Sequence, residues 1–169
     1  MEITNPKNQK GYTLIEILVA VTIIGLLFGV GYANFRGFSQ RQVVLDAAKS
    51  LQGDLRLTQE LALSGQKPDD INCASANLLD GYSFRILSSS TYEIRANCTG
   101  GVVLEPTKTV TLVTGADIAS PFPSPNPIFF KVLGSGTNIP EGTNAVIKIQ
   151  QTGTTNKSTI TISSGGQIQ

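Results

Sequence analysis

A single carboxylate stands inside a long apolar segment near the start of the chain. Glu16 lies within the stretch from Tyr12 to Ala33, which holds 22 residues and one charge. Ionisable groups in such segments are costly and usually have a partner. In one interpretation Glu16 is an interfacial carboxylate that meets the positive end of a helix dipole. In the other, cleavage after Gly11 exposes an amine on Tyr12, and this amine on a neighbouring subunit neutralises Glu16.

The absence of histidine from the 169 residues limits the kinds of catalysis and metal binding that the chain can support. Histidine is the commonest proton carrier near neutral pH and the commonest metal ligand. Ser-His and Cys-His catalysis and most zinc sites are therefore excluded. The adjacent carboxylates Asp69 and Asp70 follow a proline and are typical of a solvated turn, and Ser and Lys are too scattered to nominate a dyad. We expect no enzymatic activity, no cofactor and no metal.

Two cysteines, Cys73 and Cys98, occur in the chain. Two thiols without histidine are too few for a usual structural zinc site. A disulfide between them is the natural interpretation if this part of the chain lies outside the cytoplasm. The alternative is a pair of buried free thiols.

The elements that position these residues begin with the apolar segment, which we place at residues 12–35. As a helix, its 22 nearly uncharged residues reach roughly 33 Å, enough to cross a bilayer core. The polar residues 1–11 carry Lys7 and Lys10, which weakly favours a cytoplasmic N-terminus. Small residues after the run leave an ordinary cleaved signal peptide as the alternative. Because the run is long and leads into another helical segment without a turn, we expect it to be retained.

Residues 36–65 continue the helix with an amphipathic pattern. Charged residues, Asp54 among them, lie largely off the apolar face, and Ser64-Gly65 is a plausible stop because glycine accepts the left-handed conformation at a helix end. The sequence therefore predicts one helix from Tyr12 to about Ser64. The apolar face recurs at steps of three and four residues and consists of Val44, Ala48, Leu51, Leu55, Thr58 and Ala62.

Residues 66–169 show β-strand signals. Alternating runs rich in β-branched residues predict strands at 81–87, 91–97, 102–105, 108–114, 128–133, 144–151 and 158–164. Residues 116–127 form a proline-rich loop in which we expect no regular element. The expected fold is α+β, with two small antiparallel sheets, or one strongly bent sheet, packed on the outer half of the helix.

The stretch KGYTLIEILVAVTIIGLL, residues 10–27, resembles the class III signal of type IV pilins and of the pseudopilins of type II secretion. The resemblance implies that residues 1–11 are a leader, that a prepilin peptidase cuts after Gly11 and methylates Tyr12, and that Glu16 is the acidic residue used in assembly. The family usually has Phe where Tyr12 stands, so the aromatic character is kept. Many members have Pro where Ala33 stands, so we expect no proline kink there.

The closing segments resemble the GspH/FimT group of minor pseudopilins and minor pilins. The likeness rests on strand spacing and on Gly134, Gly136, Gly165 and Gly166. Some FimT-type proteins bind DNA through a basic C-terminal motif around the last glycine. The matching residues 165–169 here contain no Arg or Lys, and counterion release needs several cationic contacts. We therefore expect no DNA binding by this tail.

The resemblance implies a structural, minor subunit of a type IV pilus-like filament or of a type II secretion pseudopilus. Its implied partners are prepilin peptidase, other pilin or pseudopilin subunits, an inner-membrane assembly platform and the membrane. Nucleic acid is not expected, because the chain's own basic residues are spread out and absent from residues 165–169. The resemblance further implies a single-pass inner-membrane protein with an extracytoplasmic C-terminal domain, which later enters the filament. The alternative is a tip protein for adhesion or DNA uptake, in which Phe122, Phe129 and Phe130 are contact residues unless they belong to the core.

Overall fold

The computed structural model describes residues 11–74 and 76–169, without the side chains of residues 30, 31, 33, 34 and 36. The chain divides into two compact units, Met1–Ser39 and Gln40–Gln169, which we call the helical unit and the β unit. One helix, α1 (Leu14–Ser64), contributes residues to both. It ends where the sequence predicted, and Gly65 follows it in the left-handed conformation with φ of 64°.

The second half of α1 supplies one layer of the β unit. The predicted apolar face is confirmed, because Leu51, Leu55 and Thr58 are fully buried and the other three members are nearly so. The expected position of Asp54 was wrong, because only 6% of this residue is exposed. Its carboxylate has partners from two strands, which are described below.

All the strands of the β unit pair antiparallel. One sheet has the order β3-β2-β1-β6, with β4 also paired to β2, and a second sheet has the order β5-β7-β8. The prediction of two small antiparallel sheets is therefore confirmed. The strands are β1 (Leu79–Ile86), β2 (Thr91–Cys98), β3 (Gly101–Val102), β4 (Lys108–Thr111), β5 (Asp117–Ile118), β6 (Ile128–Lys131), β7 (Asn144–Gln150) and β8 (Lys157–Ser163).

One element appears where the sequence predicted none. The short strand β5 lies inside the segment 116–127, and Ile118 is paired with Ile149 of β7. The first proline of that segment is Pro121, so neither residue of β5 lacks a backbone N–H, and the Ala119 amide donates to Lys148 O of β7 at 2.8 Å. The Ile118 amide donates to Ser89 O at 2.6 Å and thereby connects the two sheets.

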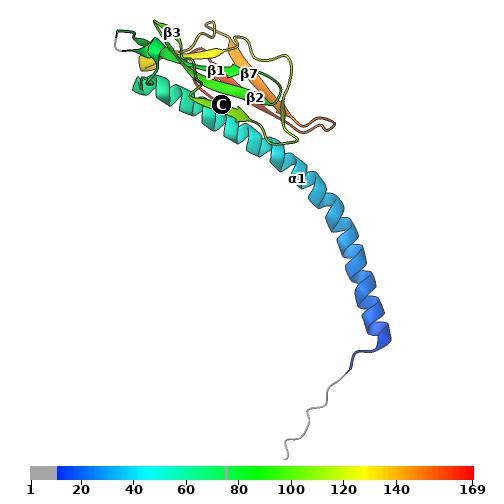
Figure 1. Cartoon of the computed structure of the whole chain (residues 1–169). Coiled ribbons are helices and arrows are strands. Elements are labelled where there is room, and N and C mark those ends of the chain that lie inside the picture. The colour runs from blue at the N-terminus through cyan, green and yellow to red at the C-terminus, as the bar shows by residue number, and fades with distance from the viewer. Residues whose placement is uncertain (1–10, 75) are drawn as a thin grey trace, which may run out of the picture. The chain divides into compact units, whose positions relative to one another are not determined.

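The core of the β unit lies between α1 and the strands, which run along the helix in Figure 1. It contains Leu51 and Leu55 from the helix, aromatic residues from β1 and β2, and isoleucines from β7 and β8. The rings of Phe84 and Tyr92 lie 4.8 Å apart between centroids, within the range that aromatic pairs prefer. This core fixes the second half of α1 against both sheets.

Candidate functional site

The start of α1 is built around Thr13. The backbone N–H of Glu16 donates to Thr13 Oγ1 at 3.3 Å, so the threonine caps the helix that begins at Leu14. Thr13 and Glu16 have the Thr-x-x-Glu spacing of a capping box, in which an acidic side chain in the first turn also meets the positive end of the helix dipole. Sequence reasoning did not assign this role to Thr13, although the spacing was visible.

Gly11 and Tyr12 precede the helix in an exposed, non-helical segment. No atom lies within 4 Å of the position that a Cβ on Gly11 would occupy, and 78% of Tyr12 is exposed. The rest of the predicted leader, residues 1–10, lies outside the described residues. The bond between Gly11 and Tyr12 is therefore open to an enzyme from the side that the structure describes.

Glu16 is exposed on the first turn of α1. Within residues 11–74 and 76–169, the ion pairs are Arg95 with Glu93 and Lys108 with Asp54, so Glu16 has no cationic partner there. The helical unit thus presents a carboxylate whose countercharge, if it has one, comes from outside the described part of the chain.

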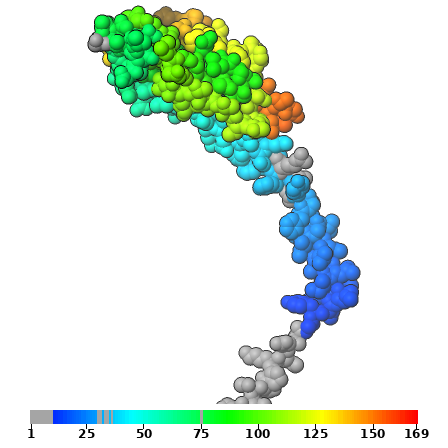
Figure 2. All heavy atoms as spheres, in the orientation of Figure 1, coloured from blue at the N-terminus to red at the C-terminus, as the bar shows by residue number. Residues whose placement is uncertain are grey.

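The apolar side chains around Glu16 are uncovered. Figure 2 shows the atoms of this part of α1 in blue, with their side chains at the surface. The exposed fraction is 65–84% for Leu14, Ile15, Leu26 and Phe28. By contrast, Leu51 and Leu55, the core leucines of α1 in the β unit, are fully buried. Among residues 11–74 and 76–169, no helix combines the length and the apolar character needed to cross a bilayer.

The two cysteines belong to the β unit, apart from the residues of the helical unit. Cys73 and Cys98 form a disulfide with 5.4 Å between their Cα atoms. Cys73 ends a short 3-10 helix, η1 (Ile71–Cys73), and Cys98 ends β2. Asp70 caps η1, because its Oδ1 accepts from the Asn72 amide at 2.8 Å, which agrees with its interpretation as a turn residue.

A polar cluster that the sequence did not reveal joins α1 to the larger sheet. Asp54 accepts hydrogen bonds from the Tyr92 hydroxyl at 2.8 Å and from Lys108 Nζ at 2.6 Å. Burial raises the pKa of Tyr92 well above its usual value, and the hydrogen bond to Asp54 adds to the shift. The cluster holds the helix in one register on β2 and β4.

The three phenylalanines considered above as ligand contacts of a tip protein are buried or half-buried. Phe130 is almost fully buried, and Phe122 packs against the core from a half-buried position. Phe129 is half-buried. Most of this aromatic surface is therefore used within the β unit.

The comparisons with known proteins agree with this arrangement. Residues 6–32 match the family model described as the prokaryotic N-terminal methylation motif. The chain is 34% identical over 76 residues to the type IV major fimbrial protein FimA of Dichelobacter nodosus, covering 43% of this chain and 48% of that protein. It is 28% identical over 85 residues to a fimbrial protein of Pseudomonas aeruginosa, covering 44% of this chain and 55% of that protein. The chain thus spans about half the length of the curated relatives it matches. No solved structure matches it.

The methylation motif and the fimbrial relatives make the chain similar to the type IV pilin-like family over less than half of its length, and the helix-plus-sheet fold agrees with that likeness. The family consists of structural proteins rather than enzymes. The GspH/FimT subgroup predicted from the closing segments is not among the relatives named above, and it stays a prediction.

Proposed function

We propose that the chain is a minor subunit of a type IV pilus-like filament or of a type II secretion pseudopilus. The observation that carries the proposal is the first half of α1, where large apolar side chains and one carboxylate are all exposed. Exposed apolar surface of this extent marks a membrane or subunit contact. A membrane covers it first, and neighbouring helices cover it after assembly.

The proposed life of the subunit begins with processing. The chain enters the inner membrane through residues 12–35, with residues 1–11 on the cytoplasmic side and residues 36–65 and 66–169 outside. Prepilin peptidase hydrolyses the bond after Gly11, which the open surroundings of that residue support, and methylates the new amine of Tyr12. An assembly platform then passes the subunit to the growing filament.

Glu16 acts in the next step. In a bundle of apolar helices an unpaired carboxylate is strongly destabilising, and a paired one is tolerated. The amine of Tyr12 on an adjacent subunit is the partner we propose, because it is a cation at the same end of an identical helix. The pairing would fix the axial register between subunits.

Assignment to the GspH/FimT group is the finer part of the proposal. It is supported by the turns after β6 and β8, where Gly134, Gly136 and Gly166 have φ of 73°, 80° and 88°. Residues that carry a side chain rarely adopt these positive φ angles, so such turns favour glycine. A tip protein for adhesion or DNA uptake remains the alternative within the same family.

The assembly role is tested by Glu16→Ala, with Glu16→Asp as the control that keeps the charge. We expect membrane insertion and cleavage to continue while filament yield falls at least about ten-fold, since breaking a buried ion pair costs about 3–5 kcal/mol. Sheared filaments are quantified by immunoblot. A normal yield from Glu16→Ala would contradict the assigned role.

Processing is tested separately by mass spectrometry of the mature chain. We expect an N-terminus at methylated Tyr12, and an unprocessed chain in Gly11→Val. The glycine contacts nothing within 4 Å of its Cβ position, so loss of cleavage in this variant reflects recognition rather than misfolding. A mature chain that starts after Ala33 would identify the apolar segment as an ordinary signal peptide.

A further inference from the structure

A small groove lies within the β unit between α1 and the turn that joins β7 to β8. Its volume is about 300 Å³, which accommodates a phosphate group with part of an attached glycerol. The groove has polar and apolar walls in similar measure, unlike the apolar first half of α1. It is lined by Arg41, Val44, Leu45, Thr155, Asn156 and Lys157.

The charge of this groove is positive. Arg41 from the helix and Lys157 from β8 both line it, and no acidic residue does so. Neither cation forms an ion pair within residues 11–74 and 76–169. Thr155 and Asn156 add a hydroxyl and an amide, which donate hydrogen bonds to phosphate oxygens.

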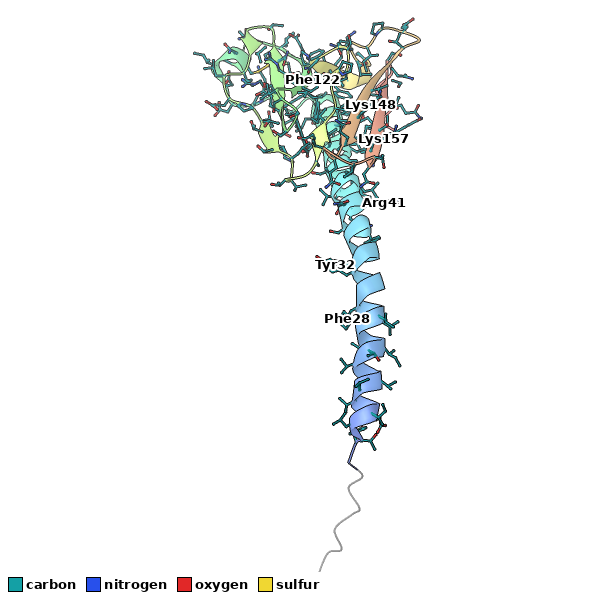
Figure 3. The ribbon with its side chains drawn as sticks, turned by 90° about the vertical axis from the view of Figure 1, so that its right-hand side faces the viewer. Phe28, Tyr32, Arg41, Phe122, Lys148 and Lys157 are labelled. Carbon is teal, nitrogen blue, oxygen red and sulfur yellow. A yellow bond between two sulfur atoms is a disulfide. The ribbon has the colours of Figure 1, made fainter. Side chains whose placement is uncertain are left out.

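A third cation extends the positive surface along the hairpin. Lys157 pairs with Gln150, and Lys148 pairs with Thr159, so the two lysines are diagonal neighbours on the outer face of β7 and β8. Such neighbours lie about 7–8 Å apart. Figure 3 shows Arg41, Lys157 and Lys148 in succession on one side of the β unit.

Chain connectivity ties the groove to the membrane-facing segment. Arg41 follows Phe35, the last residue of that segment, by six positions, and six residues span at most about 20 Å even when extended. Tyr32 and Phe35 lie on one exposed strip with Leu27 and Phe28, and tyrosine is enriched where membrane meets water. Because the groove is this near the boundary between membrane and water, the phosphates of lipid headgroups are the phosphates closest to it.

We propose that this groove binds the phosphate of an anionic phospholipid headgroup at the outer surface of the membrane, before the subunit enters the filament. The inference rests on the membrane-anchored stage of the proposed function. Two or three cations in and beside one groove suit a single headgroup, whereas duplex DNA is held by longer rows of cationic contacts. The bound lipid would orient the β unit at the membrane surface.

The test uses hydrogen–deuterium exchange of the full chain in lipid nanodiscs. One set contains phosphatidylcholine alone, and the other has phosphatidylglycerol as about one lipid in four, which gives an anionic surface. We expect amide exchange in residues 151–157 to slow by at least about five-fold in the anionic discs, since a single basic contact near such a surface already contributes about that factor. Salt at about 0.5 M should abolish the difference by screening.

The variants Arg41→Gln and Lys157→Gln should each restore most of the exchange rate seen in neutral discs. Lys131→Gln, an exposed cation on β6 outside the groove, is the matched control and should keep the protection. Exchange in β1 and β2 is followed in every variant and should not change, which separates loss of binding from loss of folding.

Several outcomes would overturn the proposal. Equal exchange in neutral and anionic discs would do so, as would protection that survives both groove variants, because that would indicate general attraction to the surface. Protection in neutral discs on adding inorganic phosphate or a DNA duplex would assign the groove to those ligands instead. Failure of the chain to co-purify with the discs would refute the anchor in the proposed function, and it is scored independently by size-exclusion chromatography.

Discussion

Asp54 shows how a charged side chain can serve the core of the β unit. It lies on α1 between Leu51 and Leu55, both fully buried, and its carboxylate receives two hydrogen bonds from the larger sheet. Lys108 is 54 positions away in the sequence. Nothing local distinguishes such an aspartate from a solvated one, so helical periodicity assigned it to the surface.

The hydroxyl of Tyr92 makes the stability of the β unit sensitive to alkaline pH. The folded state holds the phenolic proton more tightly than the unfolded chain, because its pKa is raised from 10.0 by burial and by Asp54. Stability from this group is therefore complete below about pH 10 and is lost as the pH rises above it. Burial raises the pKa of Tyr82 in the same direction.

We predict that Tyr92→Phe lowers the free energy of unfolding at pH 7 by about 1 kcal/mol, the usual value of one hydrogen bond. The same variant should lose less stability than the wild type between pH 9 and about 11. Urea unfolding at about pH 7, 9 and 11 measures both effects. Equal alkaline losses in variant and wild type would show that Tyr92 is not the titrating group.

At the scale of elements, the disulfide joins the segment that follows α1, at Cys73, to the end of β2, at Cys98. We call this region the corner of the β unit. Polar contacts also hold this corner: Asn72 Nδ2 donates to Val102 O at 2.7 Å, and the Leu104 amide donates to Asp70 Oδ2 at 3.1 Å. Arg95 adds hydrogen bonds to the carbonyls of Val103 and Leu104. The covalent bond therefore acts on a corner that is already organised.

Replacing both cysteines by serine should lower the free energy of unfolding by about 3.5 kcal/mol, the loop-closure value for a separation of 25 residues. Urea unfolding of the β unit measures it, and the reduced wild-type protein should behave like the double variant. An unchanged unfolding midpoint would mean that the polar contacts alone fix the corner.

The sequence predicted the positions of the strands better than it predicted their lengths. Strong alternation predicted β1, β2, β7 and β8 nearly to the residue, because each has one face in the core. The predicted strand 102–105 is reduced to β3, since Arg95 rather than a neighbouring strand takes the carbonyls of Val103 and Leu104. Such competition depends on tertiary contacts that local patterns do not contain.

Across the whole molecule the charges nearly cancel, at a formal net charge of +1. Basic and acidic residues are spread along the chain, and the stretch 165–169 has neither. This pattern was fully visible in the sequence. The gathering of Arg41 and Lys157 in one groove was not, because it depends on how the β7–β8 turn packs on α1.

We predict that residues 36–169 show no salt-dependent binding of duplex DNA in gel-shift assays, because specific and non-specific binding both need several cations in register with phosphates. The double variant Gln167→Arg and Gln169→Arg, which supplies a basic tail, should gain weak binding that salt removes. Retardation of DNA by the unaltered domain at low salt, and its loss at high salt, would contradict the prediction.

The contact between Gln59 and Gly166 implies a delay between the synthesis of α1 and the completion of its packing in the β unit. The Gln59 side chain on α1 donates to Gly166 O across 107 positions, and β8 supplies the core residues Ile160 and Ile162 just before that glycine. A ribosome adds about 5–20 residues per second, so the helix waits roughly 5–20 s for the segment that completes its cover. During that interval the apolar face of the helix lacks the cover that β8 provides in the folded β unit.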